Sequence, residues 1–131
     1  MDRKNVLVVK LGKIKKDNPY LKTPKPNSSK EKLNEQILKA HNTTAWALNV
    51  AQDNLQKISS VCDESYCFNF YNEYMELHNL LAKITHQVIN LRRENSLVYS
   101  EAVLILKQLK MIDICTCDFN DKMIHFVRDN N

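Results

Sequence analysis

The sequence contains only one glycine and three prolines among its 131 residues. Turns and strand connections depend on these two residue types, whereas the interiors of long helices exclude them. Hydrophobic residues make up 44% of the chain, which is enough for a packed core, and the length fits one domain. The scarcity of glycine and proline therefore favours an all-α protein.

Targeting and membrane segments are also missing. No apolar run approaches the roughly 20 residues that a membrane helix needs. The stretch NVLVVKLGKI begins apolar, but it is too short and too rich in lysine for a secretory signal. We therefore expect no membrane association, an intracellular location (cytoplasmic or nuclear) and reduced cysteines.

Motifs of common catalytic and cofactor sites are absent. Gly12 stands alone, so the chain has no glycine-rich phosphate loop, and it has no HExxH or nucleophile motif. The four histidines show no spacing typical of a catalytic pair. We expect neither enzymatic activity nor a cofactor.

The four cysteines form two closely spaced pairs, Cys62 with Cys67 and Cys115 with Cys117. A zinc ion would need its sulfur ligands about 2.3 Å away. The two pairs are expected at opposite ends of one long helix, so we expect no metal site. The thiols are interpreted as buried or half-exposed.

Positive charge is concentrated near the N-terminus. Residues 1–32 contain ten Lys and Arg against three acidic residues, a net +7, whereas the whole chain carries +4. A basic arm suits an acidic protein partner, nucleic acid or an anionic surface, and a solvated tail is the competing interpretation. The candidate residues for binding such a partner are Lys10, Lys13, Lys15, Lys16, Lys22 and Lys25.

This arm, residues 1–27, is expected to be flexible and largely extended or disordered. Residues 5–14 are its only strand-like stretch, which would need a copy of itself or a partner's sheet to pair with. A short extended tail is the alternative. Residues 15–30 are predicted to form a linker, in which Pro19, Pro24 and Pro26 exclude a regular helix.

A first helix is predicted over about residues 28–61. Ser28 and Glu31 have the spacing of a capping box. Apolar residues then recur every three or four positions from Ile37 onward. The five-residue step from Cys62 to Cys67 breaks this spacing and predicts a turn at about 62–66.

A second helix is predicted over about residues 66–112. Steps of three and four alternate without a break from Cys67 to Ile112, and no glycine or proline interrupts them. Such a helix would be roughly 70 Å long. This length favours a coiled coil or a long helical hairpin over 28–112. Residues 113–131 are expected to form a tail with a short amphipathic helix.

Asn95 occupies a core position of this heptad pattern. A buried asparagine pairs best with its own copy across a two-fold axis and thereby fixes a two-stranded state. An asparagine facing the first helix, or solvent at the end of the hairpin, is the alternative. We therefore predict a homodimer or higher bundle with an interface of Leu81, Val88, Leu91, Asn95, Val98, Ala102, Ile105, Leu109 and Ile112.

The stretches LKAHNTTAWALNVAQDNLQKI and LRRENSLV resemble the N-terminal coiled coil of shugoshin-type protectors of chromosome cohesion. The resemblance implies a chromosome-associated role. The main hypothesis is a non-catalytic coiled-coil assembly or scaffold protein that self-associates through its second helix and recruits an acidic partner. The alternative is a nucleic-acid- or chromatin-associated protein of the chromosome-segregation type, which uses the arm of residues 1–32 directly.

Overall fold

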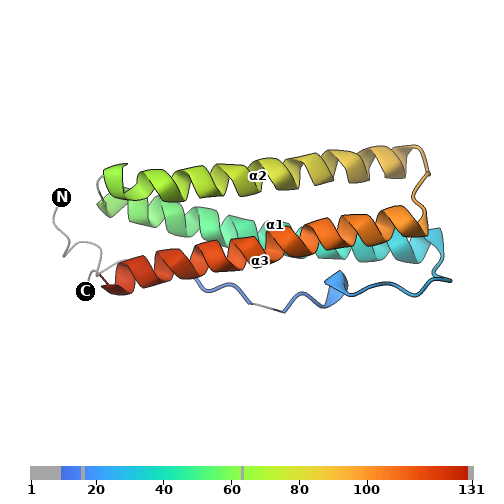
Figure 1. Cartoon of the computed structure of the whole chain (residues 1–131), viewed down its shortest axis with the longest axis horizontal. Coiled ribbons are helices and arrows are strands. Elements are labelled where there is room, and N and C mark those ends of the chain that lie inside the picture. Colours follow the sequence, from blue (N-terminus) through green and yellow to red (C-terminus); the bar gives the residue numbers. More distant parts are fainter. Residues whose placement is uncertain (1–9, 16, 63, 130–131) are drawn as a thin grey trace.

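The described residues form a bundle of three helices with an extended N-terminal arm, in which α2 runs antiparallel to both α1 and α3 (Figure 1). A computed structural model describes residues 10–15, 17–62 and 64–129. The helices are α1 (Lys30–Val61), α2 (Glu64–Arg93) and α3 (Tyr99–Asp129), and each packs against the other two. The prediction of an all-α fold is confirmed. Among the described helices, none combines the length and apolarity that crossing a membrane requires.

The first helix nearly coincides with the range predicted for it, but its cap is a different serine. Oγ of Ser29, rather than of Ser28, accepts a hydrogen bond from the backbone N–H of Lys32 at 3.2 Å. Glu31 lies in the first turn, where its negative charge interacts favourably with the positive end of the helix dipole. α1 ends at Val61, within one residue of the predicted turn.

The prediction of one continuous helix over residues 66–112 is wrong. α2 ends at Arg93 and α3 begins at Tyr99, so the chain reverses direction between them. Asn95 has a left-handed backbone with a φ of 52°. The N–H of Ser96 donates to the carbonyl of Leu91 at 2.9 Å, and the N–H of Asn95 donates to that of Arg92 at 3.2 Å. This pair of bonds is a Schellman motif, which terminates a helix.

The C-terminal residues are not a tail with a separate short helix. They form the second half of α3, which continues unbroken to Asp129. Beyond Ile112 the buried positions continue at helical spacing through Thr116, Phe119 and Met123. The polar Thr116 hides this continuation in the sequence, although its side chain is fully buried.

Six of the nine residues predicted to form a dimer interface lie in the core of the single chain. Because α2 folds back onto α3, their apolar faces meet each other and α1. Leu91 is half-buried, whereas Asn95 and Val98 are exposed in the connection between α2 and α3. These residues therefore leave no continuous exposed seam for a second copy. The others are buried: Leu81, Val88, Ala102, Ile105, Leu109 and Ile112.

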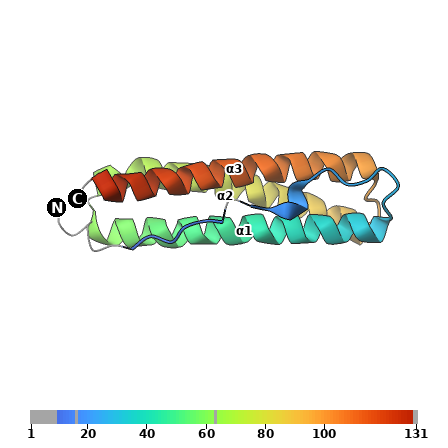
Figure 2. The same cartoon turned by 90° about the horizontal axis from the view of Figure 1, so that it is seen from below.

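The described part of the arm, up to Ser29, lies along the groove between α1 and α3 (Figure 2). It has one short 3-10 turn, η2 (Pro19–Leu21). Of the predicted strand over 5–14, residues 5–9 lie outside the described residues, and residues 10–14 form no strand. The arm was expected to be flexible, yet its described residues are docked onto the helices.

Candidate interaction surface on the arm and the first helix

The arm is anchored near its start by two buried asparagines, Asn54 of α1 and Asn120 of α3. The N–H of Gly12 donates to Oδ1 of Asn54 at 2.8 Å. The carbonyl of Gly12 accepts from Nδ2 of Asn54 at 2.8 Å and from Nδ2 of Asn120 at 3.0 Å. A Cβ at this position would lie 3.3 Å from Cγ1 of Val50, so the glycine allows a close approach to α1.

A second polar anchor lies about two to three helical turns further along the groove. Nδ2 of Asn18 lies 3.4 Å from both the carbonyl of Ala40 and Oγ1 of Thr44. The Thr44 hydroxyl donates to Oδ1 of Asp113 at 3.5 Å. Burial raises the pKa of the Asp113 carboxyl above its ordinary value, and hydrogen bonds from Asn18 and Thr44 partly oppose this shift.

Further contacts hold the remainder of the arm. Nε2 of Gln36 donates to the carbonyls of Tyr20 and Lys22 at 2.9 and 2.7 Å. The Tyr99 hydroxyl donates to the carbonyl of Pro24 at 2.9 Å. Ile14 is buried against the helices. Backbone and apolar groups of the arm therefore face inward along its length.

The lysines of the arm face outward. Lys10, Lys13 and Lys15 are exposed on the segment that Gly12 anchors, and Lys22 and Lys25 are exposed on the segment after η2. Lys16 lies outside the described residues. The backbone that carries these five exposed side chains is docked on the helices, and we call them the basic strip: Lys10, Lys13, Lys15, Lys22 and Lys25.

A hollow of about 450 Å³ lies beside the basic strip, between η2 and α1. Lys15 and Asp17 line it from the arm, and Asp113 lines it from α3. Trp46 of α1 also lines it and is 53% exposed. Tyr20 adds a second ring, with Nζ of Lys39 at 5.7 Å from the ring centroid. Charged and aromatic groups thus converge on one concave surface.

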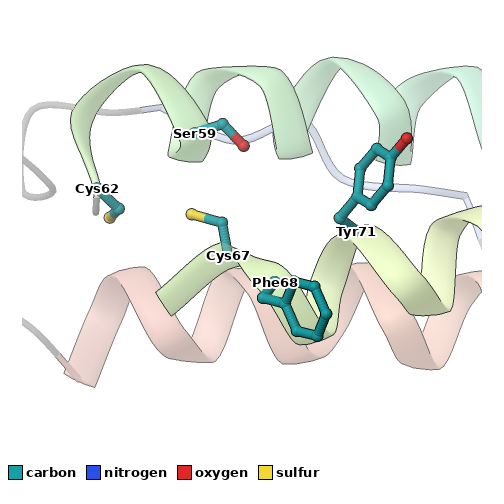
Figure 3. A pocket seen from close by; sticks show the side chains of 5 residues that line it. All are labelled: Ser59, Cys62, Cys67, Phe68 and Tyr71. Atoms are coloured by element: carbon teal, nitrogen blue, oxygen red, sulfur yellow. The ribbon is translucent and has the colours of Figure 1, made fainter. Parts of the chain in front are cut away.

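The cysteines lie in two places. Cys62 and Cys67 line a hollow of about 360 Å³ between α1 and α2, with the thiol of Cys67 pointing toward Cys62 (Figure 3). Cys115 is exposed and Cys117 buried on α3. The two cysteine pairs do not lie at opposite ends of one long helix, as predicted, because α2 and α3 are separate helices that fold back on each other. Among the described residues, no group of three His, Cys, Asp or Glu side chains could hold a metal ion.

The lysines of the arm were predicted from the sequence, whereas the residues that fix the arm were not. Asn54 and Asn120 are polar residues at core-facing positions, which resemble flaws in an apolar pattern. The lone Gly12 was a weak signal, since it is the only glycine in the chain. The second stretch resembling shugoshin, LRRENSLV, covers the end of α2 and the connection to α3 rather than one continuous helix.

Comparisons with protein-family models, with curated proteins and with solved structures found no match to this chain.

Proposed function

We propose that the protein is a non-catalytic binding module that recruits an acidic partner protein through the basic strip. The observation that carries the proposal is the fixed, extended backbone on which the exposed lysines stand. A lysine on an already ordered backbone loses less conformational entropy on binding than one on a disordered tail. The arm is thus a surface prepared for binding.

The charge of the strip selects for acidic groups. Between residues 10 and 28 the sequence has six lysines and a single acidic residue, Asp17. Such an excess of one sign steers an oppositely charged partner toward the surface and repels basic ones. Surface charges contribute modestly one by one, so affinity must come from several lysines acting together.

The hollow beside the strip offers an apolar anchor for the same partner. Trp46 and Tyr20 are exposed next to Lys15, and tryptophan and tyrosine are the residues most often found at energetic centres of interfaces. An acidic segment that carries an apolar or aromatic residue would therefore place that residue against the two rings and its carboxylates on the lysines, away from Asp17 and Asp113.

Binding of an acidic peptide and of DNA would test this proposal. Poly-glutamate and a random-sequence single-stranded DNA serve as probes, with the Lys13→Glu/Lys15→Glu variant set against a control that has the same change in charge. The control variant, Lys83→Glu/Arg128→Glu, alters two exposed residues of α2 and α3 that are not part of the strip. We expect the strip variant to weaken poly-glutamate binding about tenfold or more, from two reversed charges at roughly 1 kcal/mol each. Equal weakening by both variants, or no binding of the acidic peptide, would contradict the proposal.

Nucleic acid is the second candidate partner, favoured by the exposed rings of Trp46 and Tyr20 next to the lysines. Aromatic rings beside a basic groove are the means by which proteins bind single strands. The relative affinity for the two probes separates the candidates. For DNA, the logarithm of the affinity should also fall linearly with the logarithm of the salt concentration as counterions are released. If DNA is bound more tightly than poly-glutamate and shows this slope, the chromosome-associated alternative takes precedence.

A further inference from the structure

The outer face of α3 carries an exposed apolar stripe. Leu104, Met111 and Ile114 are 52%, 68% and 50% exposed. Leu80 of α2 is 49% exposed and lines a shallow groove with Met111. Large apolar side chains gathered in this way are typical of a surface that another molecule covers.

The described part of the chain leaves this stripe uncovered. α3 buries Leu109 and Asn120 on its side toward α1, and the stripe lies on the opposite side. The arm follows the groove between α1 and α3, and in Figure 2 the side of α3 turned away from α1 forms an edge of the bundle. Any cover for the stripe is therefore a separate molecule or a part of the chain outside the described residues.

Two opposite charges, Lys107 and Asp118, lie in line with the apolar residues of the stripe. Along the helix axis, the exposed Lys107 precedes Met111 and Ile114, and the exposed Asp118 follows them. From Leu104 to Asp118 the stripe spans an arc of only about 80° at 3.6 residues per turn. The opposite charges are about 16 Å apart along the helix, too far to pair within one chain.

We propose that this face of α3 binds a second copy of the chain in antiparallel orientation. A two-fold axis between Met111 and Ile114 places Met111 against the partner's Ile114, and Lys107 against the partner's Asp118. The symmetry makes both contacts occur twice, so the surface is complementary to itself. A parallel arrangement would instead set Lys107 against its own copy, which like charge disfavours. This dimer is distinct from the one predicted through Asn95 and does not depend on the proposed function.

The oligomeric state of the full chain, measured by sedimentation under reducing conditions, tests the proposal. We expect a reversible dimer. A buried glutamate opposite an apolar side chain is costly, so Ile114→Glu is expected to raise the dimer dissociation constant about tenfold or more. Ile89→Glu is the matched control, because Ile89 is a similarly exposed isoleucine (46%) on α2 outside the stripe, and it is expected to stay within about twofold.

Charge exchange tests the orientation. Lys107→Asp and Asp118→Lys should each weaken the dimer about fivefold, because each replaces two attractive pairs with two repulsive ones. The double variant should return to within about twofold of the wild type, since it restores both pairs in reverse. A monomer at every concentration, an equal effect of Ile89→Glu and Ile114→Glu, or a double variant weaker than either single one would overturn the proposal.

Discussion

Nδ2 of Asn54 lies 2.6 Å from Oδ1 of Asn120, across the interface between α1 and α3. Both amides also donate to the carbonyl of Gly12, and Asn54 accepts from the Gly12 N–H. One small network therefore joins two helices and the arm. Its members are shielded from water, since each asparagine side chain is about 1% exposed.

Asn54→Ala is expected to lower the free energy of unfolding by about 2–4 kcal/mol. The substitution leaves both backbone groups of Gly12 and the Asn120 amide with fewer partners, and each unpaired buried group costs about 1–3 kcal/mol. Chemical denaturation gives the value. Asn49→Ala, at an exposed asparagine of the same helix, is the control and should stay within about 0.5 kcal/mol. Equal losses in the two variants would contradict the network's importance.

Apolar spacing allowed the helical class and the first helix to be predicted, because burying one face of a helix requires that spacing. The same spacing could not reveal the break at Asn95. Apolar residues recur every three or four positions from α2 into α3, so the spacing continues across the connection. The helix ends there because Asn95 adopts a left-handed backbone. Asparagine is the residue after glycine that best tolerates a left-handed backbone, and this property was the overlooked signal.

Asn95→Val is therefore expected to destabilise the protein by about 1–2 kcal/mol, the cost of a left-handed backbone for a residue with a branched Cβ. Asn95→Gly should be neutral or stabilising by up to about 1 kcal/mol, because glycine adopts this conformation freely. Thermal unfolding measures both. The exposed side chain of Asn95 predicts an unchanged oligomeric state. A stable Asn95→Val variant would mean that the chain can adopt another connection.

The arm shows the same division between what the sequence reveals and what it hides. Its lysines can be read from the charge distribution alone, because charge needs no partner to be recognised. The partners of its backbone cannot be read, since Gly12 meets residues 42 and 108 positions away. Contacts over such separations depend on how the helices pack, which a local pattern does not specify.

The dependence of stability on pH should reveal the buried carboxyl of Asp113. Because its pKa is raised in the folded state, protonation favours folding. This contribution is present below the ordinary pKa of 3.8 and is lost as pH rises through the raised value. Asp113→Asn removes the buried charge and keeps an oxygen for Thr44. We expect the variant to exceed the wild type in melting temperature at pH 7, and by less at pH 3.5.

The matched control for this prediction is Asp118→Asn, at an exposed aspartate of the same helix. It removes an equal charge without relieving burial, so it should show no comparable gain at pH 7. If both variants gain equally, net charge rather than the environment of Asp113 determines the effect.

Cys62 and Cys67 are expected to form an intrachain disulfide when the protein is treated with oxidised glutathione. The two residues line the same hollow, and the Cys67 thiol points toward Cys62 (Figure 3). The thiolate of one cysteine displaces one glutathione, and the second cysteine then displaces the other, so that two reduced glutathiones leave. Burial, with a smaller effect of Cys67, raises the pKa of Cys62, so the reaction should be faster at pH 9 than at pH 7.

Peptide mass spectrometry would identify the linked pair by the loss of two hydrogens, and the small closed loop should stabilise the protein by about 2 kcal/mol. Cys115 is exposed on α3 and is expected to carry a glutathione adduct instead. Cys62→Ser is the control, in which the linkage must disappear. A glutathione adduct on Cys62 or Cys67 with no linkage would show that the turn between α1 and α2 holds the two sulfurs too far apart to join.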